Sequence, residues 1–254
     1  MNRKLTFKFN DKNLEIDLTE KEQKIFSNKS IFLNKDNEAW EINDSFFKKS
    51  TIVPDVFRYI LKYNHDWSFL YPNNSNAIEF SIDNDKNEID SKNHKNIILV
   101  LESPHKDEYE ITENELTPRS PASGDSGKSI NKLFTSHVLP MLISLGLELN
   151  KKDEYHFCIV NPVPFQTSLV HIHQKGLIAP IRDKIWKTMY PELKTDFETR
   201  LKKYKPHIIL NGCTSNLKPL LNDELSKIDD CKIFNVTHPA SWQRALSGFK
   251  LTHF

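Results

Sequence analysis

Apolar and polar positions follow one pattern in the first third of the chain and another in the remainder. Residues 4–18 alternate apolar and polar side chains around the segment Asn-Asp-Lys-Asn, which predicts a β-hairpin. The same part shows helical spacing at residues 20–26 and 53–63, a strand pattern at 77–82, and a polar linker or loop at 84–95. We therefore expect residues 1–95 to form an N-terminal α+β module, to which the sequence assigns no role.

Beyond residue 95, short apolar runs alternate with helical patterns. The runs predict four strands, at residues 96–101, 155–160, 207–212 and 231–237. The helical patterns lie at residues 129–147, 181–205 and 215–221, and the second is divided into two pieces at Pro191. This alternation predicts an α/β fold with a mostly parallel central four-stranded sheet, in a domain over residues 96–254.

The composition narrows the class of protein. The 254 residues are 38% hydrophobic and 27% charged, as in a globular protein rather than a disordered or membrane-spanning chain. No apolar run approaches the ~18–20 residues that span a bilayer, and the first residues lack the apolar core of a signal peptide, so we expect a cytoplasmic protein. The three cysteines, Cys158, Cys213 and Cys231, exclude a disulfide scaffold and a four-cysteine zinc or iron–sulfur site.

Charge is balanced overall, at a net +1, but it is not evenly distributed. Residues 171–254 carry 14 basic and 8 acidic side chains, a net charge of +6. Lysine and arginine side chains raise the affinity of a protein for a phosphate backbone, because their binding releases counterions. Residues 171–254 could therefore bind nucleic acid. We favour the alternative that this charge belongs to a solvated, lysine-rich helix such as residues 198–205.

The residues that follow each predicted strand are the strongest functional candidates, because ligands of open α/β sheets bind outside the carboxyl ends of the strands. These segments are Glu102–His105, Asn161–Gln166, Asn211–Cys213 and His238–Trp242. A carboxylate, an amide and an imidazole on one edge could position water, bind the polar edge of a heterocycle and stabilise a developing anion. The alternative is that each side chain caps the end of a strand.

Four motifs in order resemble the uracil-DNA glycosylase superfamily over residues 96–250. Leu101–His105 is similar to the motif G-E-A-P-G of one branch, and His238–Arg244 is similar to its H-P-A-x-x-x-R. Between them, residues 120–134 look like the glycine-containing loop that leads into a helix, residues 157–161 like the strand that ends in Asn, and residues 205–221 like the next strand and helix. The resemblance implies a three-layer α/β sandwich that flips a base out of DNA and hydrolyses its glycosidic bond.

The resemblance also implies roles for individual residues. Glu102 would activate the water that attacks C1′ of the sugar, Asn161 would bind the Watson–Crick edge of the flipped pyrimidine, and His238 would stabilise negative charge on O2 of the departing base. The substrate pocket would add Ser103, His105, Phe165 and Gln166. DNA contacts would come from Ser123, Gly124, Ser126, Gly127, Lys128, Ser129, Pro239, Ser241, Trp242, Gln243 and Arg244. Of these, Trp242, Gln243 or Arg244 would fill the gap left by the base.

Departures from the family pattern broaden the implied substrate. The branch carries four cysteines for an iron–sulfur cluster and this chain has three, so we expect no cofactor and no metal. Ser103 stands where the best-known uracil enzymes carry Asp, and His105 stands where they carry the Tyr that excludes the thymine methyl. The implied substrate is therefore uracil or a modified pyrimidine, including hypermodified cytosine in phage DNA, and the implied partner is DNA.

Other motifs offer alternatives. Ala122–Ser129 fits a relaxed phosphate-binding loop in which Lys128 would serve a nucleotide hydrolase, although the preceding segment is polar and predicts no strand. His171 and His173 could bind a metal or lie in a surface loop. Cys158 and Cys213 are interpreted as packing residues. A third alternative is a nucleic-acid-binding module that has the fold without the chemistry.

Overall fold

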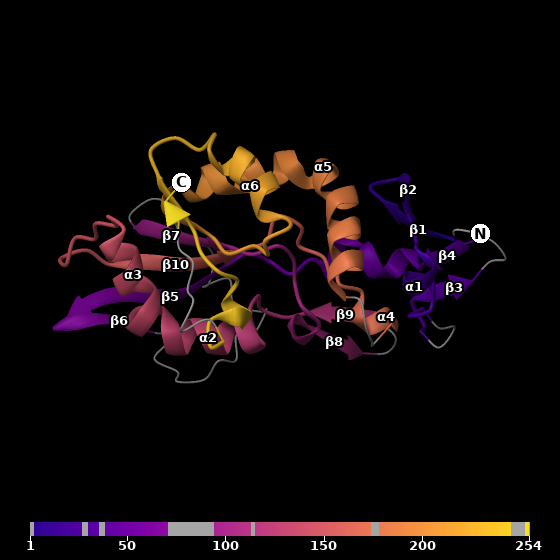
Figure 1. Ribbon diagram of the computed structural model, residues 1–254, viewed down its shortest axis with the longest axis horizontal. Coiled ribbons are helices and arrows are strands. Elements are labelled where there is room, and N and C mark those ends of the chain that lie inside the picture. Colours follow the sequence, from indigo (N-terminus) through magenta and orange to yellow (C-terminus); the bar gives the residue numbers. More distant parts are fainter. Residues whose placement is uncertain are drawn as a thin grey trace. The chain divides into compact units, whose positions relative to one another are not determined.

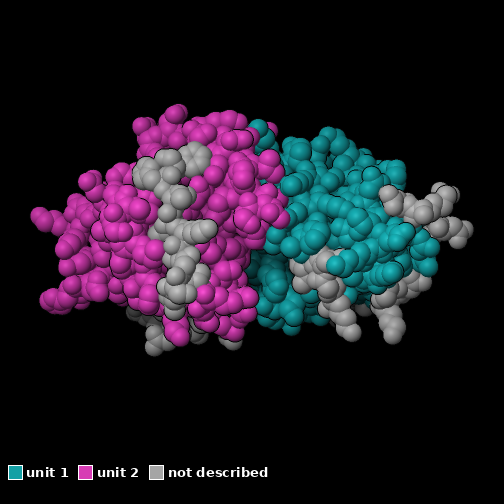
Figure 2. Space-filling model, viewed as in Figure 1, with its two compact units in different colours: residues 1–53, 103–119, 163–194 teal, residues 54–102, 120–162, 195–254 magenta. Residues whose placement is uncertain are grey.

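The computed structural model describes residues 3–26, 30–35, 39–70, 94–112, 115–173, 178–244 and 252–253. The chain forms two compact units, each assembled from separated stretches of sequence (Figure 2). Unit 1 contains residues 1–53, 103–119 and 163–194, and unit 2 contains residues 54–102, 120–162 and 195–254. The strand predicted at residues 77–82 and most of the predicted linker lie outside the described residues.

Unit 2 is built on a seven-stranded sheet in the order β13-β12-β11-β7-β10-β5-β6. Four neighbouring strands run parallel: β12 (Lys232–Asn235), β11 (Pro206–Asn211), β7 (Lys95–Val100) and β10 (Tyr155–Val160). The short β13 (Thr252–His253) extends the sheet antiparallel to β12. The predicted α/β class with a mostly parallel sheet is confirmed, but the sheet has seven strands instead of the four predicted, because β5, β6 and β13 extend its edges.

Strand β5 (Val56–Asn64) corrects the helix predicted at residues 53–63. It pairs antiparallel with β10 on one side and with β6 (Asp66–Leu70) on the other. The segment is rich in Val, Ile, Phe and Tyr, which favour strands, and its apolar spacing fits both structures. Backbone pairing along the edge of β10 therefore decides between them.

Helices cover both faces of this sheet (Figure 1). On one face, α2 (Asp125–Leu133), the π-helical turn η5 (Phe134–Val138) and α3 (Leu139–Ser144) share one apolar core with alternate residues of the strands, among them Leu99 and Phe157. On the other face lie α6 (Lys218–Leu225) and the last turns of α5. The helix predicted at residues 129–147 is thus present in three consecutive helical pieces.

Unit 1 contains a four-stranded sheet in the order β2-β1-β4-β3. Its strands are β1 (Lys4–Phe9), β2 (Lys12–Asp17), β3 (Leu33–Lys35) and β4 (Ala39–Ile42). β1 and β2 form the predicted hairpin. Asn10 and Asp11 at its turn both have positive φ, at 48° and 61°, which Asn and Asp tolerate better than most residues.

Shorter elements complete unit 1. They are α1 (Glu20–Gln23), the 3-10 turns η1 (Asp44–Phe47), η2 (Lys49–Thr51) and η4 (Lys106–Glu108), the hairpin β8 (Tyr109–Thr112) and β9 (Glu115–Pro118), and α4 (Val170–His173). Helix α1 corresponds to the first part of the helix predicted at residues 20–26. A capping box between Thr19 and Glu22 fixes its start.

Helix α5 (Ile178–Tyr204) runs unbroken through Pro191, where the sequence predicts a division into two pieces. Pro191 lies on an exposed side of the helix, while Trp186 and Phe197 on either side of it are fully buried. Proline removes one backbone donor, but burial of apolar side chains before and after it holds the helix together.

The two units do not follow the boundary predicted between residues 95 and 96. Strands β5 and β6 belong to the sheet of unit 2 because β5 pairs with β10. Conversely, residues 103–119 and 163–194 belong to unit 1, although the sequence assigns them to the catalytic domain. Within the described parts of the chain, no helix has both the length and the apolar character required to cross a membrane.

Candidate active site

Three side chains, two proposed for catalysis and one for binding the base, follow three strands of unit 2 at one edge of the sheet. Asn161 comes directly after β10, Glu102 is the second residue after β7, and His238 is the third after β12. The ladder between β7 and β10 continues past their ends, since the Leu101 N–H donates to the Val160 carbonyl at 2.9 Å. Because these strands are parallel, the three residues lie at the same, carboxyl-terminal edge of the sheet.

Glu102 and His238 form a carboxylate–imidazole pair. Oε2 of Glu102 lies 3.6 Å from Nε2 of His238 and accepts a hydrogen bond from the Thr214 N–H at 3.2 Å. Nδ1 of His238 accepts the Ala240 N–H at 3.2 Å and so caps the 3-10 turn η6 (Pro239–Ser241). With Nδ1 used as an acceptor, the proton of a neutral ring is on Nε2, the nitrogen that faces Glu102.

A lysine that the sequence did not single out lies close to this pair. Lys218 begins α6, and its ammonium donates to the Val236 carbonyl. Burial lowers the pKa of Lys218, while Cys213 and Glu102 act in the opposite direction. The candidate site therefore combines a carboxylate, an imidazole and a partly buried cation, all from unit 2.

Asn161 and Asn211 lie at the ends of β10 and β11 and differ in the state of their side chains. Asn211 is fully engaged: its Nδ2 donates to Oδ1 of Asn222 at 2.7 Å, and its Oδ1 accepts the Cys213 N–H at 3.2 Å. Asn161 is 1% exposed, and within the described chain its Oδ1 has no hydrogen-bond partner. A buried amide oxygen left unsatisfied costs about 1–3 kcal/mol, so Asn211 has a structural role and Asn161 is free to bind a donor.

The backbone of Asn161 is held by a buried ion pair between Asp55 and Arg200. Oδ1 of Asp55 accepts the Asn161 N–H at 3.3 Å, and Nη2 of Arg200 donates to the Asn161 carbonyl at 3.1 Å. Nη1 of Arg200 and the Tyr204 hydroxyl, the latter at 2.9 Å, both donate to Oδ2 of Asp55. We call these three residues, Asp55, Arg200 and Tyr204, the Asn161 clamp, because they fix both backbone polar groups of that residue.

Burial sets the electrostatics of the Asn161 clamp. It raises the pKa of the Asp55 carboxyl, and Arg200 and then Tyr204 act against that rise. Burial lowers the pKa of the Arg200 guanidinium, but Asp55 and Asp196 more than offset this, so its pKa is raised. Burial and the Asp55 carboxylate both raise the pKa of the Tyr204 hydroxyl. The hydroxyl is therefore held as a hydrogen-bond donor.

The two segments predicted to touch DNA pack against each other, since α2 contacts η6. Lys128, Gln243 and Arg244 are exposed, and four others are partly exposed: Ser123, Gly124, Ser126 and Ser241. The remaining four, Gly127, Ser129, Pro239 and Trp242, are buried. Only the exposed and the partly exposed residues are accessible to a phosphate backbone.

Gly127 has a packing role. A Cβ at this position would lie 1.8 Å from the Ala122 carbonyl oxygen and 3.2 Å from Nη2 of Arg58. The glycine thus permits close approach of helix α2 to the preceding turn, where Ala122 has a positive φ of 54°. The Ala122 carbonyl oxygen fills the space beside Gly127. The described segment before α2 is a turn rather than a buried strand. For both reasons, the structure does not favour a phosphate-binding loop around Lys128.

We predict that Gly127→Ala lowers the free energy of unfolding by about 1–3 kcal/mol, because an added methyl group must displace backbone. Urea unfolding followed by circular dichroism measures the change. Lys128→Ala is the matched control on the same helix, and since its side chain is 67% exposed it should change stability by less than about 0.5 kcal/mol. Equal stability of the wild type and Gly127→Ala would contradict the close approach.

Trp242 is a core residue, which corrects its proposed role in filling the gap left by a flipped base. It is 0% exposed, its ring packs near Phe134 with centroids 6.4 Å apart, and its indole N–H donates to the Thr237 carbonyl at 2.6 Å. Apolar burial and a satisfied polar atom fix the side chain in place. Gln243 and Arg244 are the residues of this segment that stay exposed.

Four residues proposed for the substrate pocket belong to unit 1. Oγ of Ser103 is 2.7 Å from Oγ1 of Thr167, and Nδ1 of the exposed His105 is 3.3 Å from Oδ2 of Asp107. Phe165 packs edge-on against Phe9, with ring centroids 5.4 Å apart, and is therefore a core residue. Gln166 is 1% exposed, and its Oε1 accepts the backbone N–H of His171 at 3.2 Å.

The other motifs have structural explanations. His171 and His173 lie in α4 rather than in a surface loop, and His173 is buried with Nε2 2.9 Å from the Ser168 carbonyl. Across the residues that the structure describes, no group of three His, Cys, Asp or Glu side chains is placed to hold a metal ion. Cys158 and Cys213 are buried, in agreement with a packing role.

Sequence inspection missed the Asn161 clamp, Thr214 and Lys218. Thr214 and Lys218 follow β11 closely, so the rule that ligands bind at strand ends could have found them. Asp55 and Arg200 are separated by more than half of the chain, and no local pattern connects them. Neither a protein-family model, nor a characterised protein, nor a solved structure matches the chain.

Proposed function

We propose that this protein is a monofunctional DNA glycosylase that acts in the cytoplasm and removes uracil or a modified pyrimidine, including hypermodified cytosine of phage DNA. The observation that carries the proposal is the buried Oδ1 of Asn161, which has no hydrogen-bond partner among the described residues. Asn161 follows β10, and the neighbouring strand β7 leads to Glu102, which pairs with His238. The proposal includes the finer architecture, a three-layer sandwich like that of uracil-DNA glycosylases.

The proposed reaction uses water as the nucleophile. Glu102 orients the water and accepts its proton as the oxygen attacks C1′ of the sugar. The bond between C1′ and the base nitrogen breaks, and its electron pair stays on the base. Nε2–H of His238 donates a hydrogen bond to O2 of the base, where the negative charge develops. This step needs no metal or cofactor.

Recognition of the base is assigned to Asn161. Its Oδ1 can accept an N–H from the edge of a flipped pyrimidine, which would satisfy the buried oxygen. The Asn161 clamp keeps the peptide on both sides of this side chain fixed, as a discriminating hydrogen bond requires. Glu102 is 5% exposed, so the reacting groups would act in a site with little water, where hydrogen bonds to developing charge are strongest.

The decisive test is release of a free base. The protein is incubated with duplex and single-stranded DNAs that carry uracil, 5-hydroxymethylcytosine or glucosylated 5-hydroxymethylcytosine, and the supernatant is analysed by mass spectrometry. Release of one modified base, with an abasic site left in the DNA, supports the proposal. Tight DNA binding without release from any substrate indicates a binding module instead. ATP turnover that Lys128→Ala abolishes indicates a nucleotide hydrolase.

DNA binding should depend on the exposed cations beside the site. We expect Lys128→Ala and Arg244→Ala each to weaken DNA binding alike for all sequences, and to reduce the slope of log K against log salt by about 1. Fluorescence anisotropy with a labelled duplex at several salt concentrations measures the slope. An unchanged slope in both variants would remove these residues from the DNA interface.

A further inference from the structure

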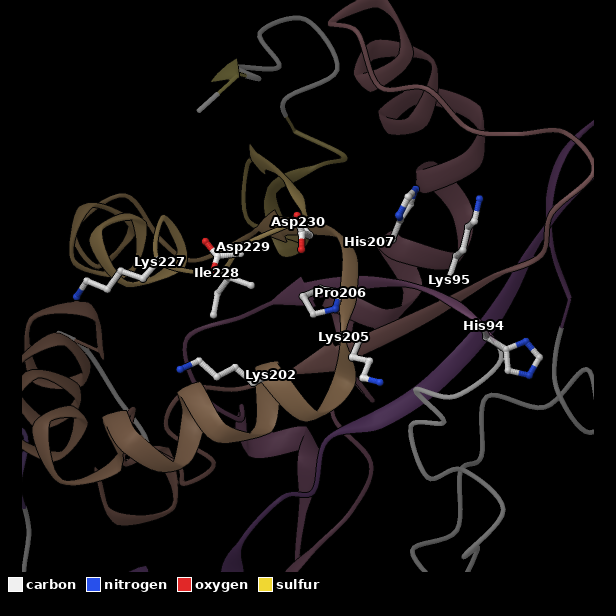
Figure 3. Close-up of a pocket in the computed structure, with 10 residues that line it drawn as sticks. All are labelled: His94, Lys95, Lys202, Lys205, Pro206, His207, Lys227, Ile228, Asp229 and Asp230. Carbon is white, nitrogen blue, oxygen red and sulfur yellow. The ribbon is translucent and has the colours of Figure 1, made fainter.

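Unit 2 also has a cavity of about 530 Å³ at the opposite, amino-terminal edge of the same parallel strands (Figure 3). Lys95 and His207 line it from the starts of β7 and β11, and Lys202 and Lys205 line it from the end of α5. A strand of six residues spans roughly 20 Å, so this cavity is separate from the site around Glu102.

Two of the four lysines that line the cavity have ion-pair partners. Lys227, from the connection between α6 and β12, pairs with Glu224 at 2.8 Å, and Lys95 pairs with Asp153. The lining also carries two carboxylates, Asp229 and Asp230. Lys202 and Lys205 are exposed, and no side chain within the described chain forms an ion pair with either of them. Two lysine ammonium groups are therefore available to a ligand.

The imidazole of His207 also lines the cavity. Burial lowers the pKa of its imidazole, and Lys95 and Lys232 lower it further, while Asp153 acts in the opposite direction. The ring is therefore neutral near pH 7 and is available for stacking or for donation of one hydrogen bond.

The rest of the lining is suited to an organic group. Pro206 and Ile228 contribute apolar surface between the lysine-bearing end of α5 and the loop that carries the two aspartates (Figure 3). The carboxylates of Asp229 and Asp230 can accept hydrogen bonds from sugar hydroxyls. The volume lies within the 300–1,000 Å³ or so that is typical of small-molecule sites.

We propose that this cavity binds a small phosphate ester of nucleotide size, with Lys202 and Lys205 on the phosphate and the apolar surface of Pro206 and Ile228 against the organic part. Lysine is a common phosphate ligand because it offers a compact charge with three donors. A cavity of this volume suits a compact molecule better than a continuous nucleic-acid backbone. The proposal does not depend on the glycosylase activity.

Isothermal titration calorimetry of the full chain at low salt tests the proposal with four probes: AMP, adenosine, inorganic phosphate and a single-stranded DNA of twelve nucleotides. We expect AMP to bind at least about tenfold more tightly than adenosine or phosphate, because it alone engages both parts of the cavity. Failure of AMP to bind at millimolar concentration would overturn the proposal. Equal binding of AMP and phosphate, or binding of the oligonucleotide only, would do the same.

Variants locate the binding. Lys202→Glu/Lys205→Glu should weaken AMP binding by about tenfold or more, since both charge-assisted hydrogen bonds become repulsions. Lys203→Glu makes the same charge change on the same helix at an exposed residue that is not part of the cavity lining, and should leave binding within about twofold. Thermal melting confirms that each variant is folded. AMP binding that the double variant leaves intact would place the ligand elsewhere.

Discussion

Glu102→Gln is expected to lose base release by about 10²–10⁴-fold while it retains DNA affinity, because a glutamine cannot accept the proton of the attacking water. The side chain remains the same size, and its amide oxygen can still accept the Thr214 N–H that now donates to the carboxylate at 3.2 Å. The fold should therefore survive the substitution. Single-turnover release of base, measured beside anisotropy of DNA binding, separates rate from affinity.

His238→Ala should lose about 10²–10³-fold in the same assay, because the donor to the developing negative charge on the base is removed. This variant also removes the acceptor for the Ala240 N–H, so a loss of stability of about 1 kcal/mol accompanies it. His238→Asn restores an acceptor for that cap in a shorter side chain and serves as the matched control. It should recover stability without recovering the rate.

The alternative assigns Glu102 and His238 only to capping strand and turn ends. On that interpretation, both variants would be less stable, and the folded fraction would release base at the normal rate. Thermal melts of the same preparations give the folded fraction. Normal excision by folded Glu102→Gln and His238→Ala proteins would overturn the proposed mechanism.

Asp55→Asn is expected to lower the free energy of unfolding by about 3–5 kcal/mol, although it changes only one atom of the side chain. The carboxylate of Asp55 is 4% exposed and accepts from Arg200, from Tyr204 and from the Asn161 N–H. Within the described chain, an amide in its place leaves Arg200 with only the exposed Asp196, 2.8 Å from its Nε, as a counter-charge, and presents a donor where an acceptor is needed. Urea unfolding at neutral pH measures the loss.

Two further variants show whether the loss comes from the unpaired charge. Asp55→Asn/Arg200→Met removes both charges and should recover a substantial part of the stability, because an apolar replacement of a buried pair is often neutral. Tyr204→Phe removes only the hydroxyl and should cost about 1–3 kcal/mol. A double variant less stable than Asp55→Asn would contradict this account of the Asn161 clamp.

The Asn161 clamp has a second effect that depends on the proposed function. Because it fixes both peptide groups of Asn161, Tyr204→Phe should lower discrimination between bases more than it lowers release of the preferred base. Comparison of two substrates at equal folded fraction detects this, since a general loss of stability lowers both rates alike.

The sequence by itself determined the elements whose signal is local. The hairpin of β1 and β2 follows from strict alternation around Asn10 and Asp11, which tolerate positive φ. The buried strands β7, β10 and β11 follow from uninterrupted apolar runs, since only strands covered on both faces need them. With strands parallel, the rule for their carboxyl ends already placed Glu102, Asn161 and His238 on one edge.

Only the tertiary structure decided the rest, because the deciding contacts join distant parts of the chain. Residues 56–64 have apolar spacing that suits a helix or a strand, and pairing with β10 selects the strand. Trp242 is fixed by the core rather than by its motif, and the ion pair between Asp55 and Arg200 spans residues that no local pattern connects. Asn161 and Asn211 carry the same side-chain amide, and both follow apolar runs that the sequence identifies as strands. Their surroundings in the folded chain leave one unsatisfied and the other fully bonded.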